Sequence, residues 1–308
     1  MSESFSSTLE AFIAKHAASP SQPVAVFDCD GTVIKGDIGE AMFYYQLENF
    51  LFRLSPALLW ADFPRREELN TLYESLADLP PEKRTRDRRF PSFANMVLSW
   101  YFDQLAEGAT EKACVDIVRL LAGFSPLETR EMAEATFAGE LQAPVTERLL
   151  GRSRLPKGVR FIQESVAMLD RLRKAGFDIW VISGSNQWSV EAVCQRLGVS
   201  SDHVIGITLV ELGGIFSSTV KKPVPVWEGK VEALQQRIGT MPDFVASDSL
   251  YDVPLFKAST DLKVLVISNN DLSKDFFRTS KIQRDHSWVV IEEPTQQQEE
   301  PSTWLMQQ

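Results

Sequence analysis

The hydrophobic positions along the chain follow two patterns, and each pattern occupies its own segments. Residues 23–27 form a short apolar run that leads into Asp28 and a turn at Gly31, which predicts a buried strand followed by a loop. From about residue 37 to 150, apolar residues recur at helical spacing between prolines, which predicts a series of helices. These predicted helices cover residues 38–53, 65–78, 92–106, 110–122 and 126–138, with a basic loop at 81–90.

Beyond residue 156, predicted strands and helices alternate. This alternation predicts an α/β fold with a parallel sheet that is covered by helices on both faces. Residues 203–220 are predicted to form a hairpin around Gly213 and Gly214. The predicted helices are 159–175, 187–197, 230–238, 250–258 and 271–279, and the predicted strands are 178–182, 243–247, 262–267 and 287–292.

The long helical segment is inserted directly after the first predicted strand. An insert at that point lies over the carboxyl ends of the strands, where open α/β sheets bind ligands, so we interpret it as an all-helical cap domain. The predicted core comprises residues 1–36 and 156–292, and the predicted cap comprises residues 37–155. The tail, residues 293–308, is polar and is predicted to be disordered.

Charge and cysteine content limit the partners that we expect. The chain has 308 residues and a net charge of −10, so it should repel nucleic acid and anionic membranes unless it has a local basic patch. Cys29, Cys114 and Cys194 are widely spaced without a CxxC pair, so neither a disulfide framework nor a cysteine zinc site is expected. The chain shows no signal-peptide pattern and no apolar run of about 18 residues. We therefore expect a cytoplasmic protein without membrane contact, and its oligomeric state stays open.

The strongest chemical motif is Asp28-Cys-Asp30-Gly31-Thr32, at the end of the first predicted strand. Two carboxylates two positions apart can face one crevice if the chain leaves extended geometry there, and Gly31 permits such a turn. Thr32 and the amides after the strand can donate hydrogen bonds to phosphate oxygens. The alternative interpretation is an ordinary acidic loop after a strand.

Later positions in the core also carry candidate chemistry, and each has an ordinary alternative. Ser183 ends the second core strand, where a hydroxyl and exposed amides can bind an anion, although Ser-Gly turns are common. Lys230 begins a predicted helix, where a lysine opposes the helix dipole unless an anion compensates it, but it can equally be a surface lysine. Asp248 and Asp252 flank a strand-to-helix turn, where Asp248 can reach a metal or simply cap the helix.

Taken in chain order, these motifs resemble those of the haloacid dehalogenase superfamily of phosphatases. Three strands end in DxDGT, Ser and DxxxD, with a lysine between the last two, and the resemblance covers residues 22–36 and 157–268. The helical insert and the hairpin make the chain similar to the phosphoserine phosphatase branch and also to phosphocholine phosphatases. The resemblance implies a Rossmann-like core, phosphatase activity and Mg²⁺ as the cofactor.

The resemblance also implies a role for each motif. Asp28 would attack phosphorus and become an aspartyl phosphate, and Asp30 would protonate the leaving group and then activate water. Mg²⁺ would be held by Asp28, Asp248 and the backbone carbonyl of Asp30, while Asp252 would support the site from behind. The phosphate-binding residues would be Gly31, Thr32, Ser183, Gly184 and Lys230.

Substrate specificity is expected to come from the insert. Asp37 matches the acidic position that meets the substrate amino group in phosphoserine phosphatases, and Glu40 could serve a choline-like cation. Aromatic residues near these carboxylates suit a quaternary ammonium group, although they can equally be helical core. We therefore expect a small phosphorylated metabolite as substrate, with phosphoserine, phosphocholine and sugar phosphates all open. The aromatic residues are Phe43, Tyr44, Tyr45, Trp60, Trp100 and Tyr101.

Several features keep other interpretations open. The fourth motif reads SDSLYD where many relatives have GDGxND, so Ser249 and Tyr251 could alter the metal site. Lys221 and Lys222 compete with Lys230 as the phosphate-binding lysine. A phosphotransferase or mutase would share all of these motifs. A non-enzymatic binding protein would be expected to lack one of the catalytic carboxylates, which are all present.

Overall fold

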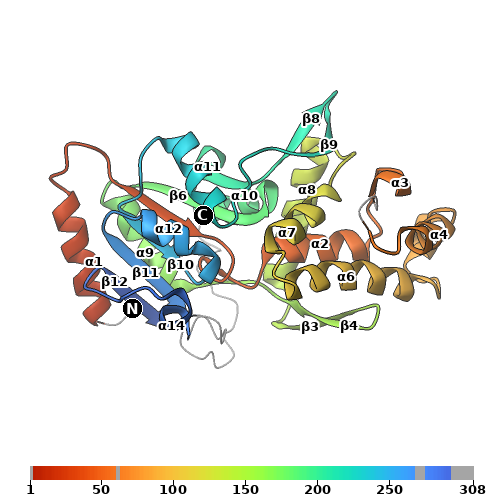
Figure 1. Cartoon of the computed structure of the whole chain (residues 1–308), viewed down its shortest axis with the longest axis horizontal. Coiled ribbons are helices and arrows are strands. Elements are labelled where there is room, and N and C mark those ends of the chain that lie inside the picture. Colours follow the sequence, from red (N-terminus) through yellow and green to blue (C-terminus); the bar gives the residue numbers. More distant parts are fainter. Residues whose placement is uncertain (1–2, 60–62, 268–274, 293–308) are drawn as a thin grey trace.

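The computed structural model describes residues 3–59, 63–267 and 275–292, and Figure 1 shows them as two parts lying side by side. One part contains a six-stranded sheet in the order β12-β11-β10-β1-β6-β7, and each neighbouring pair is parallel. The predicted α/β fold with a parallel sheet is therefore confirmed. The strands are β1 (Val24–Asp28), β6 (Asp178–Asn186), β7 (Val204–Ile207), β10 (Phe244–Ser247), β11 (Leu262–Ile267) and β12 (Trp288–Glu292).

Helices cover both faces of the sheet, which explains why β1 is buried along its whole length. Because side chains alternate across a strand, Ala25 and Phe27 join the apolar cluster on one face, and Val24 and Val26 join the cluster on the other. The first cluster includes α1 (Glu3–His16), α9 (Gln163–Lys174) and α10 (Gln187–Gln195). The second includes α11 (Glu228–Ile238), α12 (Val253–Ala258) and α14 (Phe276–Ser280).

The second part of the molecule is the insert after β1, and it has an apolar cluster of its own. Phe50, Phe93 and Tyr73 meet in this cluster, with ring centroids of Phe50 and Tyr73 5.1 Å apart. The helices of the insert are α2 (Ile38–Glu48), α3 (Pro56–Leu59), α4 (Arg66–Ala77), α5 (Pro81–Arg84), α6 (Phe90–Ala106), α7 (Thr110–Arg119) and α8 (Pro126–Gln142).

The insert packs against the sheet domain through α2, α7 and α8, whose residues Met42, Val118 and Phe137 belong to the same apolar cluster as the residues of β1 and α10. Two backbone connections add to this packing. The strands β2 (Ile34–Lys35) and β5 (Arg160–Phe161) pair antiparallel where the chain enters and leaves the insert. In addition, the hairpin of β8 (Leu209–Leu212) and β9 (Ile215–Val220) reaches the insert, because Phe216 exchanges backbone hydrogen bonds with Gly123 and Phe124. The exact boundary between core and cap, placed at residues 36/37 and 155/156, stays a prediction.

Some predicted elements differ from the structure. The insert is not all-helical, because β3 (Thr146–Leu150) and β4 (Ser153–Lys157) form an antiparallel hairpin whose residues Leu150 and Leu155 are buried in the insert's apolar cluster. The predicted hairpin at 203–220 begins later, since residues 204–207 form β7 of the main sheet. The basic segment 81–90 contains the short helix α5 rather than being a loop throughout. Two further short elements are the 3₁₀ helices η1 (Ser201–His203) and η2 (Leu250–Asp252).

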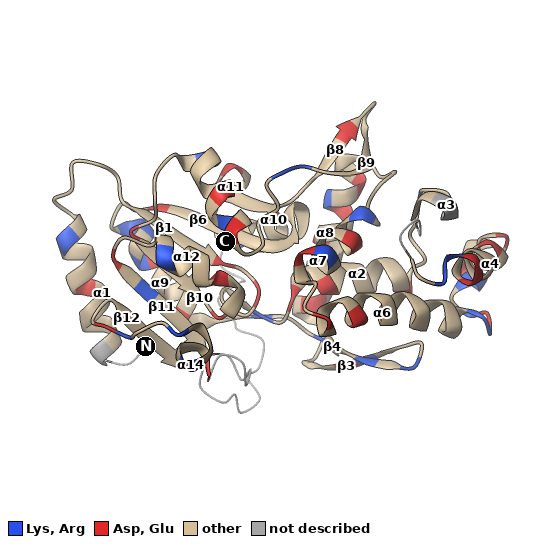
Figure 2. Ribbon diagram, in the orientation of Figure 1, with Lys and Arg blue, Asp and Glu red and all other residues tan. Residues whose placement is uncertain are grey.

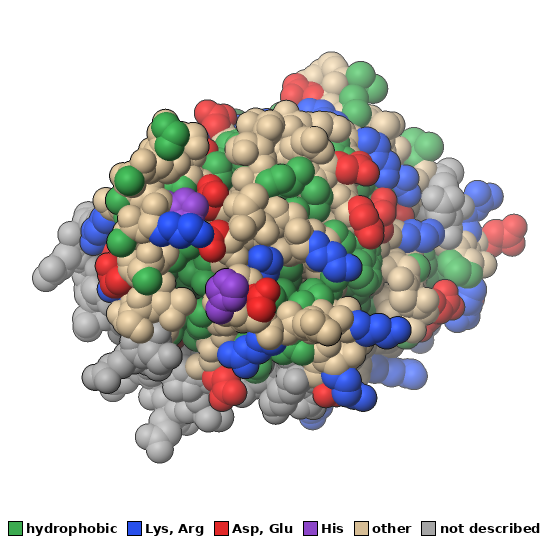
Figure 3. All heavy atoms as spheres, turned by 60° about the vertical axis from the view of Figure 1, so that its left-hand side comes forward, with side chains coloured by type: hydrophobic (Ala, Val, Ile, Leu, Met, Phe, Trp, Pro, Cys, Tyr) green, Lys and Arg blue, Asp and Glu red, His purple; other side chains and the backbone are tan. Residues whose placement is uncertain are grey.

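Charged side chains are distributed over both parts of the molecule. Figure 2 shows acidic and basic residues interspersed along the helices, and the face presented in Figure 3 carries both signs mixed together. Within the described ranges, none of the helices is long and apolar enough to cross a bilayer. The predicted tail, residues 293–308, and the first part of the predicted helix 271–279 lie outside the described residues.

Candidate active site

The carboxyl ends of three central strands bring the predicted motifs to one edge of the sheet. In the register of the sheet, Asp28 at the end of β1 lies opposite Ile182 of β6, and Phe27 lies opposite Ala246 of β10. Ser183 and Ser247, the next residues along these neighbouring strands, therefore lie at the same edge as Asp28. Cys29 is fully buried in the apolar cluster, as expected for a spacer between the two aspartates.

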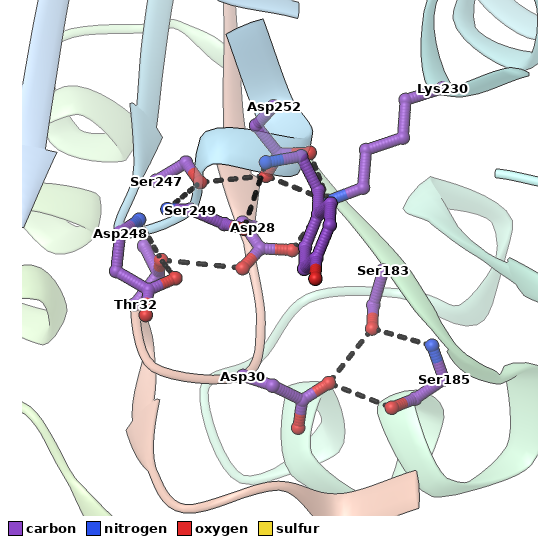
Figure 4. Close-up of polar contacts among 11 residues, drawn as sticks. Asp28, Asp30, Thr32, Ser183, Ser185, Lys230, Ser247, Asp248, Ser249 and Asp252 are labelled. Carbon is purple, nitrogen blue, oxygen red and sulfur yellow. Dashed lines mark hydrogen bonds and ion pairs between the residues drawn. The ribbon is translucent and has the colours of Figure 1, made fainter. Parts of the chain in front are cut away.

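Asp28 is held from both sides (Figure 4). Lys230 donates to Asp28 Oδ1 at 2.7 Å, and the Thr32 hydroxyl lies 3.3 Å from Asp28 Oδ2. The same ammonium group forms an ion pair with Asp252 at 2.7 Å, and the Ser247 hydroxyl donates to Asp252 at 2.6 Å. Lys230 is thus a buried cation that joins two carboxylates, which excludes the interpretation of a solvated surface lysine.

Asp248 lies on the other side of Thr32. The Thr32 hydroxyl is 3.3 Å from Asp248 Oδ1, and it accepts the backbone N–H of Asp248 at 2.9 Å. Gly31, with φ +74°, leaves the space that Asp248 occupies, since a Cβ atom on Gly31 would stand 2.1 Å from Asp248 Oδ2. The turn after β1 therefore brings the side chains of Asp28 and Asp248 to one threonine hydroxyl.

Asp30 points away from this pair and toward the insert. Its Oδ2 accepts hydrogen bonds from Ser183 at 2.9 Å and Ser185 at 2.7 Å, and its Oδ1 accepts the N–H of Ile38 at 2.7 Å. Ile38 begins α2, so the positive end of that helix faces the carboxylate. Ser185 was missed in the sequence, although β6 continues past residue 182, and residues two apart on an extended strand face the same side.

The charges of this site are unbalanced. Burial raises the pKa of Asp28 well above its ordinary value, with Lys230 opposing the rise and Asp252 and Asp248 adding to it. Burial and the nearby Asp252 raise the pKa of Asp248 to about 7. Burial alone would lower the pKa of Lys230, but Asp252 and Asp28 raise it above its ordinary value. A further cation would therefore be stabilised here.

The donor set suits a hard divalent cation. Asp28 and Asp248 offer carboxylate oxygens around one small cradle at Gly31, and oxygen donors in excess of positive charge are what Mg²⁺ prefers. No three His, Cys, Asp or Glu side chains of the described chain are arranged to hold a metal. Two side chains, a backbone carbonyl and water would complete the shell, because Mg²⁺ usually keeps several waters.

A cavity of about 500 Å³ opens between the sheet edge and the insert. Asp28, Asp30, Gly184 and Lys230 line it from the sheet side. Ser183 and Gly31 also line it, so it brings the predicted phosphate-binding residues together, apart from Thr32, which is fully buried behind it. Ser249 and Tyr251 line the same cavity, and the rival lysines 221 and 222 do not.

The insert contributes an acidic end to this cavity. Asp37 caps the N-terminus of α2, and burial raises its pKa well above the ordinary value. Glu40 accepts hydrogen bonds from the hydroxyls of Tyr44 at 2.7 Å and Tyr101 at 2.9 Å. Of the other aromatic residues named from the sequence, Phe43 and Trp100 belong to the apolar cluster of the insert, Tyr45 packs against the main core and Trp60 is not described.

Gly31→Ala tests the cradle directly. The added methyl group would collide with Asp248 Oδ2 and would be strained at φ +74°, so we expect weaker Mg²⁺ binding and activity reduced by about 100-fold or more. Gly213→Ala is the matched control, because Gly213 has φ +62° with nothing within 4 Å of an added Cβ. Titration of both variants with Mg²⁺ during a phosphatase assay measures the difference. Equal Mg²⁺ dependence of the two variants would contradict the cradle.

Comparison with known proteins decides the family. A family model described as haloacid dehalogenase-like hydrolase matches residues 93–257, which is more than half of the chain. The chain belongs to the haloacid dehalogenase-like hydrolase family. The matched segment contains Ser183, Lys230 and Asp248, and the geometry adds the Asp28 motif that precedes it. The family predicted from the sequence, and with it the prediction of a hydrolase, is confirmed.

Solved structures with this family's fold are similar at low sequence identity. A conserved functionally unknown protein from Anaerococcus prevotii DSM 20548 matches with a TM-score of 0.72 and 19% identity over 90% of this chain and 89% of that chain. A protein with unknown function from Bordetella pertussis Tohama I matches with a TM-score of 0.55 and 17% identity over 88% and 98%. A phospho-aspartyl intermediate analogue of phosphoserine phosphatase matches with a TM-score of 0.43 and 13% identity over 89% of this chain and 94% of that chain, and no argument rests on this match. Curated protein sequences gave no match.

Proposed function

We propose that the protein is a Mg²⁺-dependent phosphomonoesterase that acts through an aspartyl phosphate on a small phosphorylated metabolite. The observation that supports this most strongly is the position of Asp28, a buried carboxylate at a strand end that lines the cavity between Lys230 and Thr32. Lysine and a divalent cation beside a carboxylate neutralise phosphoryl oxygens that would otherwise repel an anionic nucleophile.

In the first step, a carboxylate oxygen of Asp28 attacks phosphorus. The bond between phosphorus and the ester oxygen breaks, its electron pair stays on that oxygen, and Asp30 supplies the proton that makes the leaving group an alcohol. Burial raises the pKa of Asp30, although its hydrogen bonds from Ile38, Ser185 and Ser183 oppose the rise. A raised pKa helps a carboxyl group to hold a proton near neutral pH.

In the second step, Asp30 takes a proton from water while the water oxygen attacks phosphorus. The bond between phosphorus and Asp28 breaks, inorganic phosphate leaves, and the carboxylate of Asp28 returns to its starting state. Ser183 and Ser185 hold Asp30 in place for both proton transfers, and Lys230 neutralises phosphoryl oxygens. Bound Mg²⁺, held by Asp28, Asp248 and the carbonyl of Asp30, would add positive charge next to the transferring group.

The acidic end of the cavity supports a substrate whose leaving group carries a positive charge. Asp37 and Glu40 lie in the cavity lining of the insert, and among the described residues no lysine or arginine side chain is a main electrostatic partner of either. Phosphoserine-like and phosphocholine-like esters both carry such a charge and fit the proposal.

The three cysteines, all within the described ranges, are unpaired, which supports a reducing, cytoplasmic compartment.

A phosphotransferase or mutase is the second candidate, because an acceptor other than water could take the phosphoryl group from Asp28. A panel of phosphorylated metabolites assayed with Mg²⁺ tests both. We expect release of inorganic phosphate, lost in EDTA and regained when Mg²⁺ is restored. Release that persists in EDTA would contradict metal dependence, and release that requires an added alcohol or sugar acceptor would favour the transferase.

A further inference from the structure

Two aromatic side chains of the sheet domain stand exposed in the wall of the cavity. Trp227 is 36% exposed and Tyr251 is 39% exposed, and their ring centroids lie 4.9 Å apart at 84°, an edge-to-face pair. Together the two rings form a contiguous aromatic surface in the cavity wall, and contiguous exposed apolar surface is typical of binding sites. Trp227 precedes Lys230, the proposed phosphate-binding lysine, by three residues, and Tyr251 lies between Asp248 and Asp252. The pair therefore borders the reaction site from two loops.

Trp227 occupies a backbone position that favours glycine. Gly229 donates to the carbonyl of Val226 at 3.0 Å, which closes a β-turn with Trp227 at its second position. Trp227 has φ 54° and ψ −129°, the conformation that glycine adopts at this position of a type II′ turn. Such strain persists mainly at functional sites, where a particular side chain is required. Trp227 thus holds its ring in the cavity wall from a strained backbone position.

Tyr251 differs from the asparagine that many relatives have at this point of the fourth motif. Its backbone N–H donates to the Ser249 hydroxyl at 3.1 Å, which caps η2 and fixes the turn between the two aspartates. Among the described residues, neither the Ser249 side chain nor the Tyr251 side chain forms a hydrogen bond with Asp248. The ring of Tyr251 is instead directed to Trp227, so this departure changes the cavity wall.

The rest of the cavity lining shows what kind of group these rings would meet. Three of the five tyrosines in the chain line it, together with Trp227, while none of the 19 phenylalanines does so among the described residues. The described lining includes seven acidic residues and two lysines. Both carboxylate oxygens of Glu40 already accept tyrosine hydroxyls. Burial raises the pKa of Glu40, and these two hydrogen bonds oppose the rise and so favour the charged form, which would attract a cation into the cavity.

We propose that Trp227 and Tyr251 form a specificity-determining pair that contacts a methylated ammonium group on the leaving group. The substrate class is then the phosphate monoester of a quaternary amino alcohol. A quaternary ammonium donates no hydrogen bonds and binds instead to aromatic faces and to diffuse negative charge. This inference rests on the proposed phosphatase function, which is tested separately by the substrates below.

The experiment compares kcat/KM for choline phosphate, ethanolamine phosphate and glycerol 3-phosphate in the presence of Mg²⁺. In the wild type we expect choline phosphate to exceed glycerol 3-phosphate at least tenfold, with tetramethylammonium chloride as a competitive inhibitor. Trp227→Gly removes the ring and suits φ 54°, and thermal melting of the variant establishes that it is folded under the assay conditions. The preference for choline phosphate should nevertheless fall about tenfold, the size of a cation–π contribution.

Matched variants separate the ring from the fold. Tyr251→Phe keeps the ring and should keep the preference, whereas Tyr251→Ala should lose it. Leu212→Ala removes an exposed apolar side chain at the hairpin, outside the cavity lining, and should behave as the wild type. An unchanged substrate ratio in Trp227→Gly and Tyr251→Ala, or a wild type that favours ethanolamine phosphate, would overturn the inference while leaving the phosphatase function standing. No phosphate release from any ester would overturn both.

Discussion

Asp28→Asn is expected to abolish phosphate release, with a loss of at least about a thousandfold in kcat/KM. A carboxamide cannot form the acyl phosphate, so the two-step route is closed although the pocket keeps its shape. The fold should survive, because burial already raises the pKa of Asp28 well above its ordinary value, and a neutral side chain of the same size removes repulsion from Asp252 and Asp248.

Steady-state phosphate release and thermal melting together measure this prediction. Asp170→Asn is the matched control, since it removes one carboxylate from an exposed ion pair with Lys174 on α9 and should leave both readings near the wild type. Peptide mapping after rapid acid quench should find phosphate on the peptide that contains residue 28 only in proteins that retain Asp28. Wild-type rates in Asp28→Asn would refute the covalent mechanism.

Much of the sheet and its edge could be predicted because short apolar runs led directly into polar residues. The apolar run at residues 23–27 ends at Asp28, and the predicted strand at 243–247 leads into Asp248, so both carboxylates were expected at the carboxyl edge of a parallel sheet. That edge is shared by all strands of such a sheet, which is why Ser183 could be placed there as well. Local pattern was sufficient wherever a motif directly followed a buried strand.

Other parts depended on contacts between distant segments, which local pattern does not contain. Lys230 was one of three candidate lysines, and only its burial between Asp28 and Asp252 distinguishes it. Ser185 reaches Asp30 because β6 continues to Asn186, beyond the strand end predicted at residue 182. Trp227 reads in the sequence as an ordinary residue before a helix, because its backbone conformation is set by the turn it occupies.

The insert and the sheet domain share the proposed acid–base residue. Asp30 belongs to the loop after β1, yet one of its oxygens is bound by Ile38 at the start of α2 and the other by two serines of β6. Gly39 allows this close approach, since a Cβ there would stand 2.4 Å from the Ser185 hydroxyl. The orientation of Asp30 therefore depends on α2 remaining seated against β6.

Lys230→Met is expected to cause the largest combined loss, of both activity and stability. The substitution removes the buried cation that Asp28 and Asp252 share, and removing one partner of a buried ion pair costs about 3–5 kcal/mol in free energy of unfolding. Activity should fall by about a thousandfold or more, because the phosphoryl oxygens lose a charged donor in a water-poor cavity. Lys174→Met, which breaks an exposed pair with Asp170, should cost about 0.5 kcal/mol or less.

The double variant Lys230→Met with Asp28→Asn separates charge balance from packing. If the single variant is unstable because two buried carboxylates lose their cation, removing one of those carboxylates should restore part of the free energy of unfolding without restoring activity. Urea unfolding in EDTA measures this, since bound Mg²⁺ would otherwise compensate the charge.

Lys230 lowers the pKa of Asp28 relative to burial alone, so its loss favours a protonated Asp28 in the folded state. The folded state then binds more protons than the unfolded state, and the deficit of the single variant should grow as pH rises. A deficit that is independent of pH and unchanged in the double variant would mean that Lys230 stabilises the protein through the packing of its aliphatic stem rather than through its charge.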